Sequence, residues 1–211
     1  MRIFKVLFLN QLIIAKQLFK NLLVALLFFL VTIVLFCRTG SISFINLFIL
    51  CIEASGISCL PLELLVEKKE NMLNYLFTQG INKYSYIFSK LIIPVVLSFG
   101  ISIIPMAAIF HFQPVMVSLV AVETTIILSA ILWSLLILIF HLLLNGEILP
   151  RLLSGISPLF IILGTYLIGW VQDKFMWITN GILLSESIIL LFTCYAIMQR
   201  KEWEIHFFHE E

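Results

Sequence analysis

The sequence VMVSLVAVETTIILSAILWSLLILIFHLL, at residues 115–143, is an apolar run in which Glu123 is the one Asp, Glu, Lys or Arg residue. A helix needs roughly 20 residues to cross the hydrocarbon core of a bilayer. The run exceeds this length, so it predicts a transmembrane helix that is tilted, kinked or extended beyond the lipid. This helix sets the class of fold expected for the rest of the chain.

The composition of the whole chain agrees with that class. Hydrophobic residues make up 62% and charged residues 12% of the 211 residues, whereas a soluble domain typically carries about 25% charged residues. The net charge of +1 gives no reason to expect nucleic acid as a partner. We therefore expect a single all-α transmembrane domain over residues 1–211, surrounded by membrane lipid and lacking a soluble catalytic domain.

Apolar runs recur along the chain, and together they predict a polytopic protein with six transmembrane helices. The segment before them, residues 1–20, predicts an amphipathic helix in the membrane interface, because its four Lys and Arg residues fall within about 60° of one another on a helical wheel. The sequence leaves open a re-entrant piece after residue 170. The six spans are predicted near residues 22–37, 44–61, 91–110, 115–143, 155–171 and 177–198.

The distribution of positive charge orients these helices. With the N-terminus in the cytoplasm, only Arg38 and Lys174 of the 13 Lys and Arg residues fall on the outer side. Lys and Arg concentrate in the cytoplasmic loops of membrane proteins. Both termini, including a tail at 199–211, are therefore predicted to be cytoplasmic, in a plasma membrane of the bacterial type.

The longest polar stretch, LELLVEKKENMLNYLFTQGINKYSYIFSKLI at residues 62–92, joins the second and third predicted spans. Apolar residues repeat in it at helical spacing, Gly80 is a typical helix stop and Asn82 is a typical N-cap. We expect a helix, a sharp turn and a second helix that continues through Lys90 into the third span; the alternative is an ordinary solvated loop that is helical. The predicted apolar face contains Met72, Leu73, Leu76 and Phe77, and the predicted water-facing side contains Glu67, Lys68, Lys69, Glu70 and Asn74.

One motif within this segment is similar to that of a known family. Its residues are Glu67-Lys-Lys-Glu70-Asn71-Met72-Leu73-x-x-Leu76, then a turn, then Tyr86-Ile87-Phe88-Ser89-Lys90-Leu91. It resembles the first cytoplasmic connection in the permease subunits of type-2 ABC exporters. A haem-exporter-like subunit is a close variant of such a permease. Asn71 stands where that family commonly has glycine, and Gly80-Ile81-Asn82 stands where it often has a proline. The predicted layout of spans and termini extends the resemblance over the whole chain.

The resemblance implies an export permease that works as a pair of chains, identical or different, each docked on a separate ABC ATPase. The chain has no GxxxxGK[ST] stretch, so ATP is expected on the partner, and this chain is expected to be a transport subunit and no enzyme, with no cofactor or metal of its own. The implied cargo is an amphipathic peptide, a drug or a lipid-like molecule. The implied coupling segment is residues 62–90, with Glu67, Glu70, Leu73, Leu76, Phe77 and Lys90 as coupling residues.

Three glutamates fall inside predicted spans. An acidic side chain is costly in lipid, so each should face the protein interior or a water-filled path. Without a buried Lys or Arg beside them, they would suit a cationic or amphipathic cargo. The alternative is a carboxyl group held between helices by Ser and Thr hydroxyls. The candidate translocation path comprises Asn46, Glu53, Gly56, Glu123 and Glu186.

Two other functions stay open. A substrate-capturing subunit of a vitamin importer has a similar number of spans, although the outer loops RTGSIS and HFQP are short for capping a ligand pocket. An intramembrane enzyme is the third possibility, and the chain has neither an HExxH nor a GxSxG motif. The cysteines form no CxxC pair and are expected to be small core residues, not disulfides or zinc ligands; they are Cys37, Cys51, Cys59 and Cys194.

Overall fold

The computed structural model of the chain describes residues 60, 64, 67, 75, 78 and 80 and the ranges 82–112, 118–143 and 173–208. In this part of the chain every regular element is an α-helix. The predicted interfacial helix, the first and fifth predicted spans and nearly all of the second lie outside the described residues. The same holds for seven of the predicted site residues: Asn46, Glu53, Gly56, Glu70, Leu73, Leu76 and Phe77.

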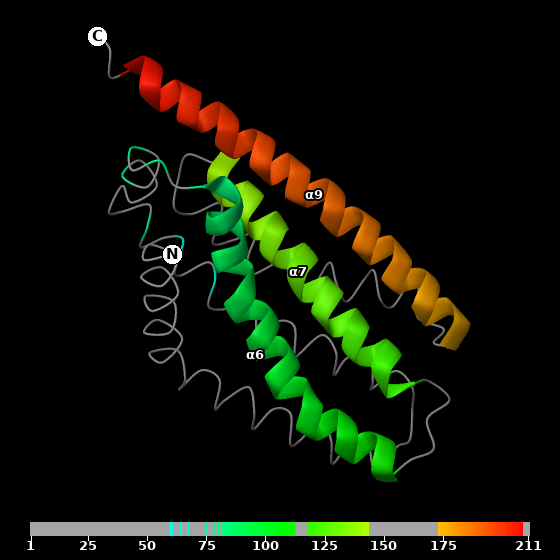
Figure 1. The fold of residues 1–211 in the computed structure, drawn as a ribbon. Helices are drawn as coiled ribbons and strands as arrows, with labels where there is room; N and C mark the ends of the chain where they lie inside the picture. Colours follow the sequence, from blue (N-terminus) through cyan, green and yellow to red (C-terminus); the bar gives the residue numbers. More distant parts are fainter. Residues whose placement is uncertain are drawn as a thin grey trace.

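Three long helices form the described part of the fold (Figure 1). They coincide with the third, fourth and sixth predicted spans. Each contains a stretch that is long and apolar enough to cross a membrane, which supports a multi-pass membrane protein. The helices are α6 (Lys83–Phe112), α7 (Leu119–Leu143) and α9 (Asp173–Phe208).

The membrane-length stretches differ from the predicted spans at their ends. In α6 the stretch is Lys83–Ile103, which begins eight residues before the span predicted at 91–110, and in α9 it is Trp177–Arg200. Because α9 is helical from Asp173 onward, the described residues after 172 form one continuous helix and no re-entrant piece.

The start of α6 follows the predicted stop and cap. Gly80 has a φ of 65°, the left-handed conformation that glycine adopts without steric cost. The side-chain Oδ1 of Asn82 accepts a hydrogen bond from the backbone N–H of Tyr84 at 3.0 Å, which satisfies one of the N–H groups left free at a helix start. Helix stop and N-cap are therefore confirmed, and α6 begins at the residue after the cap.

Helix α6 runs in the direction opposite to that of α7 and α9. Ser102, in the second half of α6, contacts Glu123 near the start of α7, so these two helices are antiparallel. Thr125 of α7 contacts Asn180 near the start of α9, so α7 and α9 are parallel (Figure 1). These directions agree with those expected for the third, fourth and sixth of six spans.

The core lies at the end of the bundle where α6 begins and where α7 and the apolar stretch of α9 end. Leu60 and Leu64, four residues apart and both helical, add a fourth segment to it. Side chains inside a membrane gain little from leaving lipid, so such a cluster is stabilised by close packing. Its buried members include Leu60, Leu64, Tyr86, Ile87, Leu91, Leu135, Leu138, Leu142, Cys194 and Met198. Cys194 is a free, buried thiol, which confirms the core role predicted for that cysteine.

Helix α9 is the least covered of the three. Only 17% of its membrane-length stretch is buried, against 50% in α6 and 61% in α7. Its outward side is apolar and includes Ile182 and Ile189. In Figure 1 it lies along one side of the group of described helices, next to α7. A large part of α9 therefore faces lipid or another molecule.

Candidate functional site

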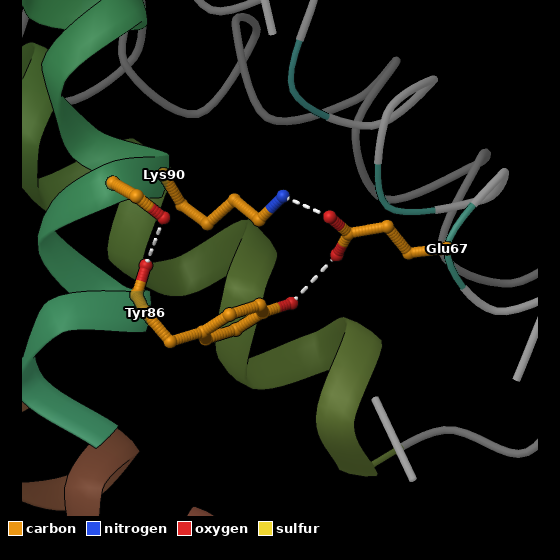
Figure 2. Close-up of polar contacts among 4 residues, drawn as sticks. Glu67, Tyr86 and Lys90 are labelled. Atoms are coloured by element: carbon orange, nitrogen blue, oxygen red, sulfur yellow. Dashed lines mark hydrogen bonds and ion pairs between the residues drawn. The ribbon is translucent and has the colours of Figure 1, made fainter. Parts of the chain in front are cut away.

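The connector, which is the part of the predicted coupling segment before α6 (residues 62–82), is joined to α6 through the carboxylate of Glu67 (Figure 2). The ammonium Nζ of Lys90 donates to Glu67 Oε1 in an ion pair. The phenol of Tyr86 donates to Glu67 Oε2 at 2.8 Å. Only 2% of Glu67 and of Tyr86, and none of Lys90, is exposed. Both oxygens of the carboxylate are thus engaged in a site from which solvent is excluded.

The geometry of α6 explains why it offers two donors to one carboxylate. Tyr86 and Lys90 are four residues apart, so their side chains lie on the same face of the helix. The Nζ of Lys90 also lies 5.3 Å from the centre of the Tyr86 ring, a cation–π distance. The Ser89 hydroxyl donates to the Tyr86 carbonyl at 2.6 Å. The N-cap at Asn82 fixes this first part of α6, and so fixes the position of both donors.

A buried ion pair contributes more to geometry than to stability. Replacing both charged residues with apolar residues of similar volume often leaves the folding stability unchanged. Removing only one partner lowers that stability by about 3–5 kcal/mol, because the other charge is left buried and unpaired. The pair of Glu67 and Lys90 therefore fixes the position of the connector relative to α6, at the end of the bundle where α7 and α9 also pack.

The structure corrects the sequence analysis at Glu67. That residue was predicted to face water, and it is buried instead. Its partners come 19 and 23 residues later in the chain, so local periodicity within the connector does not reveal them. A signal was present upstream, because Leu60, Leu64 and Glu67 share one helical face at spacings of four and three, and both leucines are fully buried.

Lys90 is the second correction. The absence of a buried Lys or Arg was part of the argument for a cationic cargo, yet Lys90 is fully buried within the membrane-length stretch of α6. The neutralising carboxylate comes from outside that helix. Tyr86, the third member of the site, was quoted in the sequence motif, but no role was predicted for its hydroxyl group.

Other described residues of the connector lie at its surface. Tyr75 is 61% exposed, and Thr78, Gly80 and Asn82 are exposed as well. Tyr75 and Thr78 are both helical, and the Thr78 hydroxyl donates to the Tyr75 carbonyl at 2.8 Å. At Tyr75 and Thr78 the connector is therefore helical and exposed.

Glu123 lies between α6 and α7. Its Oε2 is 2.6 Å from the hydroxyl of Ser102, and its Oε1 is buried with no hydrogen-bond partner in the described part of the chain. Ser102 is itself fully buried and also contacts the Phe99 carbonyl at 2.8 Å. This is the arrangement of the alternative interpretation, a carboxyl group held between helices by a hydroxyl.

Glu186 has a different environment. It lies on the exposed side of α9, and no hydrogen bond or ion pair of its carboxyl group is found within the described residues. Glu186 and Glu123 belong to different helices and are not in contact. The structure therefore brings together two predicted site residues, Glu67 and Lys90, and keeps these two glutamates apart.

A polar contact that the sequence analysis missed joins α7 to α9. Asn180 is buried and donates through Nδ2 to the Ala121 carbonyl at 3.1 Å. Its Oδ1 accepts from the Thr125 hydroxyl at 2.8 Å. The signal in the sequence was a single amide near the start of an apolar run, which is too weak to identify a partner 55 residues away.

The described residues contain no group of three His, Cys, Asp or Glu side chains that could hold a metal ion. Comparison with known proteins gives no matching family model, no matching curated protein and no matching solved structure. The function is therefore argued from the chain's own residues.

Proposed function

We propose that the chain is the permease subunit of an ATP-driven ABC exporter, with residues 62–90 as the segment that couples it to a separate ATPase. The buried contact of Glu67 with Tyr86 and Lys90 is the observation that carries this proposal. A coupling segment must be fixed to the helices that it moves, and this contact supplies such an attachment.

Displacement of the connector is transmitted through the helix ends. The face of α6 that holds Glu67 also packs, through Tyr86, Ile87 and Leu91, in the same buried cluster as the end of α7 and residues Cys194 and Met198 of α9. A push on the connector therefore reaches three helices at once. Packed clusters move as units because they cannot deform continuously.

The partner that pushes is an ABC ATPase bound on the cytoplasmic face. The proposed contacts with the ATPase are Glu70, Leu73, Leu76 and Phe77 of the connector. Tyr75 and Thr78, in the same segment, are exposed. An apolar ridge flanked by charges suits docking into a groove. ATP is bound and hydrolysed by the partner, and this chain forms the path for cargo.

The exporter works as a pair of six-span chains in a plasma membrane of the bacterial type, with both termini in the cytoplasm. The parallel direction of α7 and α9 supports the predicted fifth span between them, because two spans that run the same way need a crossing between them. The cargo is an amphipathic peptide, a drug or a lipid-like molecule, and the path includes Asn46, Glu53, Gly56, Glu123 and Glu186.

Recovery of an ATPase with the affinity-purified chain tests the coupling role. Glu70→Arg and Leu73→Asp should abolish recovery while leaving membrane insertion and yield unchanged. The matched control is Lys174→Glu, which also reverses a charge but lies on the predicted outer side. Normal ATPase recovery with both connector variants would show that the connector is not the docking site.

The side of the membrane on which the connector lies provides an independent test. In a variant whose native cysteines are replaced, a cysteine at the exposed position Tyr75 should react with a membrane-impermeant maleimide in inside-out vesicles only. Reaction in right-side-out cells would place the connector outside and remove the basis of the proposal.

A further inference from the structure

Glu186 lies deep within the apolar stretch of α9. At a rise of about 1.5 Å per residue, it is about 13 Å along the helix from Trp177 and about 21 Å from Arg200, the two ends of that stretch. Both distances place its carboxyl group within the hydrocarbon region of a membrane that α9 crosses. An acidic residue at such a depth is costly, and it usually faces a polar partner or marks a functional site.

The surroundings of Glu186 supply no such partner within the described residues. Glu123, by comparison, is near the start of its helix, is half-buried and is hydrogen-bonded to Ser102. Glu186 points away from the packed side of α9, where Asn180, Ser187, Cys194 and Met198 are buried. No side chain within the described residues therefore compensates a carboxylate at Glu186.

The side chains that flank Glu186 are apolar and accessible. Ile182 and Ile189, one turn before and one turn after it on the same face, are 49% and 64% exposed. The combination is one carboxylate between two exposed aliphatic side chains. A ligand that complements this surface has a positive charge for the carboxylate and apolar groups around that charge for the isoleucines.

We propose that Glu186, with Ile182 and Ile189, forms a binding site for the cationic centre of a lipophilic organic cation. The site rests on the proposed export function, for which it defines the class of cargo. Phospholipid headgroups cannot supply this cation, because they stay at the membrane surface, whereas a cation shielded by apolar groups enters the hydrocarbon region. The carboxylate provides charge complementarity, and the two isoleucines contact the apolar body.

Binding of tetraphenylphosphonium to the purified full-length chain in detergent tests the site. Equilibrium dialysis should detect binding of this cation and little binding of tetraphenylborate, an anion of nearly the same shape. Glu186→Gln should weaken binding of the cation at least tenfold. The matched control is Glu202→Gln, which neutralises a glutamate of α9 beyond its membrane-length stretch and should bind as the unmodified chain does.

Two results would overturn the site. One is equal binding of the cation and the anion, which indicates unspecific partition into detergent and protein. The other is unchanged binding of the cation by Glu186→Gln. If this variant does not remain monodisperse, the unmodified chain is labelled with dicyclohexylcarbodiimide, which reacts with carboxyl groups in apolar surroundings. Tetraphenylphosphonium should protect Glu186 from labelling, and lack of protection counts against the site.

A second copy of the chain is the competing occupant of this face. Protection of Glu186 that depends on protein concentration, and not on the added cation, would assign the face to α9–α9 pairing and would refute a ligand site. Failure of the cation site and failure of the proposed ATPase-docking role can be told apart by two variants. Glu186→Gln should still recover the ATPase, and Glu70→Arg should still bind tetraphenylphosphonium.

Discussion

Glu67 and Lys90 are 23 residues apart in the chain and meet inside the protein, where 2% of the glutamate and none of the lysine is exposed. One belongs to the connector and the other to the membrane-length stretch of α6. Their contact fastens the connector to the helix bundle.

Lys90→Met should lower the free energy of unfolding by about 3–5 kcal/mol, because Glu67 is then buried without its cation. The double variant Glu67→Leu, Lys90→Met should recover most of this loss, since no charge remains buried. Thermal unfolding in detergent measures both. If the effects of the two single substitutions simply add in the double variant, the two side chains are not coupled.

Tyr86→Phe should lower the free energy of unfolding by about 1–3 kcal/mol, because Glu67 Oε2 loses its donor in a buried site. Tyr84→Phe is the matched control two residues earlier in α6. Tyr84 is 38% exposed and stacks on Tyr195 through its ring at 4.5 Å, a contact that phenylalanine keeps. Equal thermal midpoints for the two variants would contradict the role of the Tyr86 hydroxyl.

Gly80→Ala should destabilise the protein by about 1 kcal/mol, because an L side chain is strained at a φ of 65°. Steric contact is not the reason, since a Cβ at Gly80 would meet nothing within 4 Å. Gly100 has equally open space but lies inside α6. Gly100→Ala should therefore stabilise by up to about 1 kcal/mol, and opposite shifts in thermal midpoint are the expected pattern.

Asn180→Leu should weaken the contact between α7 and α9 and cost about 1 kcal/mol, because the hydrogen bonds of the Asn180 amide to Ala121 and Thr125 are lost. The Thr125 hydroxyl keeps the Ala121 carbonyl as an acceptor at 2.9 Å. Thr124→Val is the control one residue away. The Thr124 hydroxyl contacts the carbonyl of Val120 in its own helix at 2.7 Å, and within the described residues it makes no hydrogen bond to α9. A cysteine pair at the ends of α7 and α9 should cross-link less readily in Asn180→Leu and normally in Thr124→Val. Unchanged cross-linking in both would show that Asn180 does not hold the helices together.

Local signals predicted the helices well. The apolar runs that became α6, α7 and α9 are long enough to be recognised by length and hydropathy alone. Gly80 and Asn82 were predicted correctly because a helix stop and an N-cap act on backbone groups within a few residues. Such features depend on near neighbours and are visible in one sequence.

Contacts between distant segments were not predictable in the same way. Glu67 lies in the charged run EKKE, a pattern that predicts a solvent-exposed surface. Its burial becomes evident only from its contacts with Tyr86 and Lys90 in the folded chain. The different environments of Glu123 and Glu186 likewise depend on which side of each helix is covered. Periodicity gives little guidance here, because both α7 and α9 are apolar all round.

The order of Glu67 and Lys90 along the chain bears on biosynthesis. A lysine that enters the bilayer alone is opposed by about 2.5–3.5 kcal/mol at the centre of a helix. Glu67 precedes Lys90 by 23 residues, so its carboxylate is already synthesised when Lys90 leaves the ribosome and is available as its counterion.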